Sequence, residues 1–75
     1  MRKKENLAFL VSVGKNLRVI RISKGFTQRA FAFSCDIEPG SLNRIEHGKS
    51  NTSLSLVKTM CDVLGIKPVL LFEIP

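Results

Sequence analysis

The spacing of three glycines is the feature of this sequence that most limits its fold. Gly25, Gly48 and Gly65 each follow a stretch whose apolar residues recur at helical spacing, and glycine commonly stands just past the end of a helix. No segment shows the strict alternation of a strand or the signature of a two-residue hairpin turn. We therefore predict an all-α domain of five helices. They cover about residues 5–24, 27–34, 38–47, 54–64 and 68–73.

Length and charge narrow the class of protein further. The chain has 75 residues, which is room for a single small domain over residues 1–75 with a thin core. Its 12 Lys and Arg residues outnumber 6 Asp and Glu residues, so the net charge is +6. Such an excess on a small body favours a polyanionic partner, either nucleic acid or an anionic membrane surface.

The same composition excludes several kinds of site. Cys35 and Cys61 are too few for a disulfide framework, and with His47 they lack the spacing of a zinc site. No apolar run is long enough for a transmembrane helix. The apolar stretch after the basic start is broken by Ser12 and has no signal-peptide cleavage site. We therefore expect a reduced, cytoplasmic protein without a metal or other cofactor.

The first predicted helix carries a charge on its apolar side. Its stripe at helical spacing comprises Leu10, Val13, Gly14, Leu17 and Ile20. Arg21 falls on the side of Leu10, where an unpaired guanidinium is costly. Glu46 follows Leu42 by four residues and lies beside Ile45, on the inner side of the third helix. We predict a buried ion pair between Arg21 and Glu46, the alternative being two solvated surface charges.

Residues 27–47 contain two short predicted helices with only about three residues between them. Ala32 stands where the two helices must touch, since a larger side chain there would push them apart. Asp36 takes the turn position that needs a left-handed backbone, which glycine prefers and aspartate tolerates. The apolar residues expected to bury between the helices are Phe31, Ile37, Leu42 and Ile45. This pattern is typical of a helix-turn-helix.

The outward side of the second of these helices is polar. Gly40, Asn43, Arg44 and His47 lie at positions i, i+3, i+4 and i+7, with Ser41 beside them. Amide, guanidinium and imidazole groups can bond base edges or phosphates. An ordinary solvated helix face is the alternative. Within a helix-turn-helix of a basic protein, we favour contact with double-stranded DNA.

Three motifs follow one another along the chain. They are Gly14-Lys15-Asn16-Leu17-Arg18 continuing through Arg21 to Lys24-Gly25-Phe26-Thr27-Gln28, then Arg44-Ile45-Glu46-His47-Gly48-Lys49, then Ser53-Leu54 through Leu64-Gly65-Ile66. Together, over about residues 13–72, they resemble the lambda-repressor-like, Cro-type (XRE) helix-turn-helix family. The resemblance implies a five-helix transcription regulator of bacterial or phage type, bound to the nucleoid, that acts as a homodimer on a palindromic operator. The family's buried arginine–glutamate pair falls on Arg21 and Glu46.

Carried over position by position, the resemblance implies two sets of DNA contacts. The base-reading positions are Glu38, Ser41, Asn43 and Arg44. The phosphate-contacting positions are Gln28, Arg29, His47, Lys49, Ser50, Asn51 and Ser53. Pro39 and Gly40 stand where relatives often carry long polar side chains, and neither can read a base edge by hydrogen bonding. Arg44 is the strongest candidate for direct readout, because arginine can bond guanine in a bidentate manner.

The C-terminal segment, about residues 66–75, is too apolar for the free end of a monomer. We expect part of it to pack on the first and fourth helices and the rest to bury against a second copy, the alternative being a wholly intramolecular packing. The predicted dimer-interface residues are Val69, Leu70, Leu71, Phe72 and Ile74, to which Leu7 and Val11 could add. A two-fold dimer would hold its two recognition helices about 34 Å apart, one turn of B-DNA. The small size and this ending resemble the controller proteins of restriction–modification systems.

Three other functions are weaker. An antitoxin-like or adaptor module that grips a protein is favoured by the apolar ending and by Phe33, which stands where the family usually has a charged residue. Cys35 and His47 could be imagined as nucleophile and base, but no third orienting group is evident, so we expect no enzyme and no small-molecule substrate. Membrane-surface binding is disfavoured because the basic residues of the first helix are scattered around it.

Overall fold

The computed structural model describes residues 4–73, so the prediction for Ile74 lies outside the described residues. The helices are α1 (Lys4–Ser23), α2 (Gln28–Ser34), α3 (Pro39–Glu46), α4 (Leu54–Leu64) and α5 (Val69–Phe72). The predicted all-α fold is confirmed, and each predicted helix is present with its ends within one residue of those expected. Among the described residues no helix is long and apolar enough to span a membrane.

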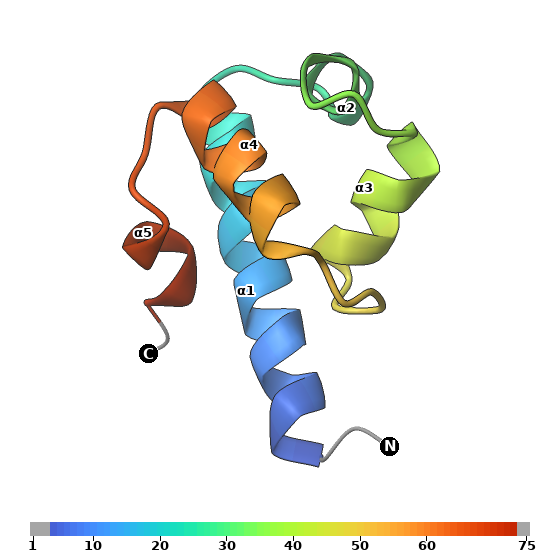
Figure 1. Cartoon of the computed structure of the whole chain (residues 1–75), viewed down its shortest axis with the longest axis vertical. Coiled ribbons are helices and arrows are strands. Elements are labelled where there is room, and N and C mark those ends of the chain that lie inside the picture. The colour runs from blue at the N-terminus through green and yellow to red at the C-terminus, as the bar shows by residue number, and fades with distance from the viewer. Residues whose placement is uncertain (1–3, 74–75) are drawn as a thin grey trace.

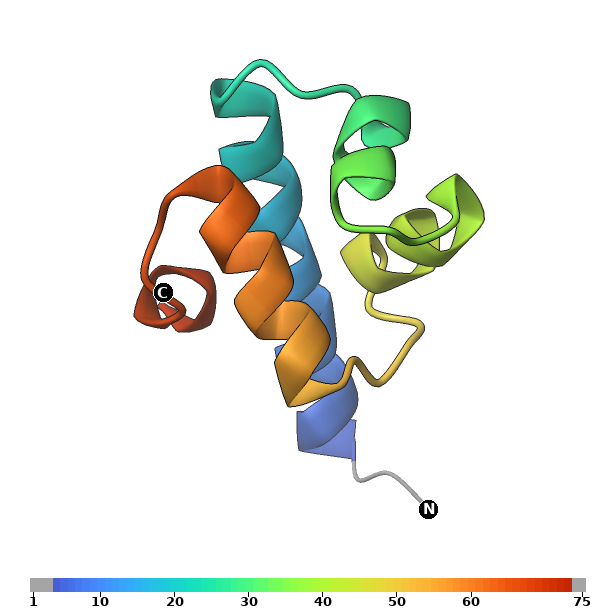
Figure 2. The same cartoon turned by 45° about the horizontal axis from the view of Figure 1, so that its top comes forward.

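The long helix α1 runs through the middle of the molecule (Figure 1). Helix α4 lies beside it, α2 and α3 lie to one side of this pair, and α5 lies to the other (Figures 1 and 2). The principal extents are 32 × 24 × 20 Å. The helix-turn-helix and the C-terminal helix are therefore on opposite sides of the domain.

Local sequence signals account for the helix ends. The hydroxyl of Thr27 accepts a hydrogen bond from the Ala30 amide at 3.0 Å, and that of Ser53 accepts one from the Leu56 amide at 3.1 Å. Each hydroxyl satisfies an amide that has no partner within its helix. Asp36 has a φ of 59°, the left-handed conformation expected at the turn between α2 and α3. These caps and this turn fix where α2, α3 and α4 begin.

The core lies between α1 and the other four helices. Its fully buried large side chains are those of Leu17, Phe31, Leu42, Met60, Cys61 and Leu71. Leu71 was predicted at the surface of a dimer interface, but it is a core residue instead, because only 1% of it is exposed. In a helix of a single turn one side faces inward, and Leu71 is on it. Val69, Leu70 and Phe72 remain at least 40% exposed.

Helix α5 is attached to α1 by a polar contact that the sequence did not indicate. The Asn16 amide nitrogen donates to the carbonyl oxygens of Leu71 at 2.8 Å and Glu73 at 2.9 Å. These carbonyls at the end of a helix have no partner within it. Asn16 supplies that partner from α1 and holds the C-terminal segment against the core.

Candidate DNA-binding surface

A buried polar network supports α3 from behind. The Arg21 Nε donates to Glu46 Oε2 at 2.6 Å and the Arg21 Nη2 to Glu46 Oε1 at 3.2 Å, with 5% of the arginine and 3% of the glutamate exposed. The Arg21 Nη1 also donates to the Phe26 carbonyl at 2.7 Å. Such a bidentate pair is geometrically specific and tolerates burial because its polar atoms are bonded. The pair expected from the helical positions is thus present.

A third side chain joins this network. The Gln28 Nε2 donates to Glu46 Oε1 at 2.9 Å, so one carboxylate binds α1 and the start of α2 to the end of α3. Gln28 was expected at a phosphate, and its half-buried amide already bonds the Glu46 carboxylate. Only the second hydrogen of that amide is left to donate to an anion. The network fixes how α3 is presented at the surface.

The opposite side of α3 is exposed. Ser41, Asn43 and Arg44 lie at the surface, as does Glu38, which precedes the helix and makes no side-chain capping bond. Gly40 has no other group near the position of a β-carbon. The structure brings these sequence-predicted residues together on one surface, which we call the recognition face: Glu38, Gly40, Ser41, Asn43, Arg44 and His47.

Two members of the recognition face bond to the protein's own main chain. The Arg44 Nη2 donates to the Lys49 carbonyl at 3.1 Å, and the His47 Nδ1 lies 2.8 Å from the Asn43 carbonyl. Because a carbonyl oxygen only accepts, His47 Nδ1 is the donor in this bond, and Nε2 is left for another partner. Both side chains are exposed, and the Arg44 guanidinium keeps further N–H groups for another acceptor.

The residues expected at phosphates are spread around this face. Arg29, Lys49 and Asn51 are exposed, and Ser50 is half-buried. Ser53 is exposed, but its hydroxyl oxygen already caps α4. Its first role is therefore structural.

Two cations that the sequence analysis missed border the recognition face. Lys15 and Arg18 on α1 line the same hollow as Gln28, Asn43 and His47. Both are exposed, and among the described residues that line the hollow the one carboxylate, on Glu46, is paired with Arg21. Their spacing of three residues was the available signal, because it puts both on one side of a helix. The hollow is therefore cationic.

A metal site and a reactive thiol are two other kinds of chemical site that residues 4–73 could form. No group of His, Cys, Asp and Glu side chains there could hold a metal ion. Burial raises the pKa of the Cys35 thiol, and burial together with Asp62 raises that of Cys61. Higher pKa values favour the unreactive thiol over the thiolate.

Comparison with known proteins decides the family. A family model described as helix-turn-helix matches residues 17–71. The chain belongs to the Cro-type (XRE) helix-turn-helix family. It is 36% identical to the control protein C.BamHI of Bacillus amyloliquefaciens over 56 residues, which cover 73% of this chain and 69% of that protein.

Solved structures of similar proteins support the same family assignment. The restriction-modification controller protein C.AhdI of Aeromonas hydrophila is 34% identical and superposes with a TM-score of 0.83, covering 87% of this chain and 98% of that one. The clp gene regulator ClgR of C. glutamicum is 31% identical with a TM-score of 0.80, covering 84% and 82%. This Cro-type protein is a DNA-binding transcription regulator, and its family is not an enzyme class.

Proposed function

We propose that residues 1–75 act as one DNA-binding domain that pairs into a homodimer on a palindromic operator and carries out no catalysis. The observation that supports this most is the recognition face, which presents Asn43 and Arg44 outward from a helix braced on its other side by Arg21 and Glu46. A braced helix keeps its side chains in register with base edges of the major groove. Binding to DNA places the regulator at the nucleoid of a bacterial or phage-infected cell.

Base reading in this proposal rests on four side chains. Arg44 bonds guanine, and Asn43 and Ser41 bond the neighbouring edges. Glu38 is free of any capping bond and can accept from a cytosine amino group. Pro39 and Gly40 add no hydrogen bond, so part of the sequence preference comes from DNA shape.

The proposed phosphate contacts lie around the recognition face. Arg29, Lys49, His47 and the loop from Ser50 to Asn51 hold the flanking backbone, with the free hydrogen of Gln28. Lys15 and Arg18 extend the same cationic surface onto α1. Each charge that neutralises a phosphate releases condensed counterions, so affinity falls steeply as salt rises.

The regulatory setting follows from the relatives. C.BamHI is named a control protein, and C.AhdI, which is matched over 98% of its length, is named a restriction-modification controller protein. We propose that this protein is likewise a controller, which recruits or occludes RNA polymerase at a promoter near its operator.

Selection of bound fragments from random duplex DNA tests this function. The wild-type protein should enrich a palindrome, and Arg44→Ala should lose preference at one base pair in each half-site, equal to about 1–3 kcal/mol of discrimination. Lys49→Ala is the matched control, because it should weaken all sequences alike and lower the slope of affinity against salt by about one. An Arg44→Ala protein with unchanged affinity and unchanged base preference would show that Arg44 does not read a base.

A second function is favoured by one observation. Phe33 on α2 is 87% exposed, which is unusual for a large aromatic side chain. An antitoxin-like or adaptor module would use such a residue to grip a partner protein. Capture of partners after nuclease treatment distinguishes the two functions, since a DNA-dependent regulator should lose its partners when the DNA is destroyed.

A further inference from the structure

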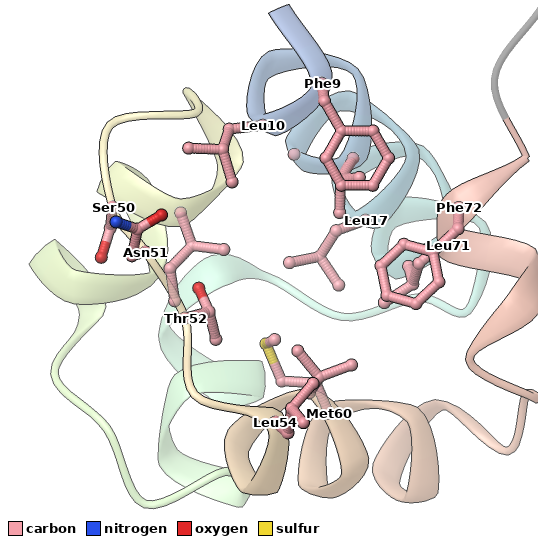
Figure 3. Close-up of a pocket in the computed structure, with 14 residues that line it drawn as sticks. Phe9, Leu10, Leu17, Ser50, Asn51, Thr52, Leu54, Met60, Leu71 and Phe72 are labelled. Atoms are coloured by element: carbon pink, nitrogen blue, oxygen red, sulfur yellow. The ribbon is translucent and has the colours of Figure 1, made fainter. Parts of the chain in front are cut away.

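An apolar pocket opens beside the start of α4, away from the polar network. Its volume is about 210 Å³. Leu17, Met60 and Leu71 from the core form part of its wall, and Phe9 and Phe72 stack at its edge with ring centroids 6.0 Å apart (Figure 3). An apolar cavity of about 150 Å³ already holds a benzene molecule, so this pocket can take a hydrophobic side chain.

The residue beside this pocket is as unusual as the pocket itself. Leu54 lines it, yet is 83% exposed at the first position of α4 (Figure 3). An exposed aliphatic side chain next to an apolar pocket gives the surface both a projection and a recess. Two copies related by a two-fold axis can exchange them, because an isologous interface brings the same patch of each copy together.

We propose that the pocket takes Leu54 of a second copy, and that the reciprocal insertion forms the centre of the homodimer. This deepens the dimer in the proposed function and depends on it. The predicted interface at residues 66–75 contributes Leu71 and Phe72 to the wall of this pocket, while Val69 and Leu70 lie outside it.

The uncharged lining of the pocket allows a second copy to approach there. The chain has a net charge of +6, so two copies repel each other over most of their surface. None of the 14 residues that line the pocket is ionisable. Ser50, Asn51 and Thr52 form a polar edge around the apolar centre, which is the usual anatomy of a protein interface.

The position of the pocket also suits a DNA-binding dimer. A standard interface covers about 800 Å² of each partner, which is about 15% of the 5234 Å² surface of this small domain. The two-fold axis passes through the centre of this patch, so the position of the patch sets the distance between the two recognition helices. A contact at Leu54 is near the loop that follows α3, whereas Leu70 is on α5, across α1 from α3 (Figures 1 and 2). Pairing through Leu54 therefore holds the two recognition helices closer together than pairing through Leu70 would, toward the roughly 34 Å spacing of one DNA turn.

Paired substitutions test the insertion. Leu54→Asp should raise the dimer dissociation constant at least about tenfold, because it puts a charge into an apolar pocket. The fold should persist, since Leu54 is exposed and aspartate is favourable at a helix N-terminus. Val69→Asp is the control, because Val69 is 63% exposed and outside the pocket, and it should leave dimerisation unchanged. Sedimentation equilibrium measures both.

A resonance inside the pocket gives a second readout. The chain has two methionines, and Met60 lines the pocket. The NMR signal of the Met60 methyl group should shift with protein concentration in the wild type and not in Leu54→Asp. The insertion of Leu54 is overturned if Leu54→Asp dimerises like the wild type, or if Val69→Asp is the variant that dissociates. In either case, selection of a palindrome would still support the operator-binding dimer. A wild-type protein that stays monomeric and selects a single half-site overturns both.

Discussion

On the inner side of α3, Leu42, Ile45 and Glu46 are at most 8% exposed, while on its outer side Asn43 and Arg44 lie at the surface. The two sides also differ in how their polar groups are satisfied. Inside, Glu46 is bonded by two other side chains, and no buried side-chain polar atom among the described residues lacks a partner. Outside, Arg44 and His47 bond only main-chain carbonyls within five residues of them.

The bonds on the inner side of α3 therefore orient the helix, whereas the side chains on its outer side are free to contact DNA. The inner bonds join segments far apart in the sequence, so breaking them lets α3 move relative to α1. The outer bonds are local and exposed, so exchanging one for a bond to DNA costs little, because water already competes for it. Substitutions on the inner side should therefore change stability, and substitutions on the outer side should mainly change recognition.

The largest effect is expected from breaking the inner pair. Arg21→Met leaves the buried Glu46 carboxylate without its cation, and we expect a loss of about 3–5 kcal/mol in the free energy of unfolding. The double variant Arg21→Met with Glu46→Leu should recover most of that loss, since it removes both charges. Urea denaturation of the three proteins measures these differences.

An exposed ion pair provides the control. Lys58 and Asp62 are 2.8 Å apart, but their side chains are 76% and 64% exposed. Lys58→Ala should leave the unfolding midpoint nearly unchanged, because solvent screens such pairs. A similar loss in Lys58→Ala and Arg21→Met would show that burial of the inner pair has no special weight.

The inner side is also the part that the sequence predicted best. Helical periodicity places Leu42, Ile45 and Glu46 on one side, and an arginine within an apolar stripe requires an acid opposite it. Such rules need only the spacing of residues along one helix. Gln28 escaped them, because its inward rotamer depends on where α2 lies relative to α3.

The surface was harder to predict, for related physical reasons. Lys15 and Arg18 border the recognition face only because α1 passes beside α3, which no local pattern encodes. The burial of Leu71 in the core was not predicted, because a single helical turn of apolar residues does not indicate which side is buried. The pocket beside Leu54 arises where four helices and a loop meet, so it is visible only in the folded chain.

The next largest effect is expected where α1 presses on the inner side of α3. A β-carbon on Gly14 would lie 2.5 Å from the Ile45 carbonyl oxygen and 2.6 Å from that of Glu46. Alanine favours a helix over glycine by about 1 kcal/mol. Both neighbouring atoms belong to the backbone of α3, so the helices must separate, and we expect Gly14→Ala to destabilise the protein by a net of about 1–3 kcal/mol. Thermal unfolding measures the change, and a stabilised variant would contradict the close contact.

The smallest effect, of opposite sign, is expected on the outer side at Gly40. No other group lies within 4 Å of a β-carbon built there, and its φ is not in the left-handed region. Gly40→Ala should therefore gain about 0.5–1 kcal/mol from the lower entropy of the unfolded chain, raising the melting temperature by several degrees. DNA affinity should stay the same, since Gly40 reads no base in the proposed complex. A stabilised variant with weakened binding would instead show that the backbone of α3 approaches the groove at Gly40 too closely for a methyl group. Gly14 lies on α1 against the inner side of α3, and Gly40 lies on the outer side of α3. Adding one carbon at each position thus compares the two sides of α3.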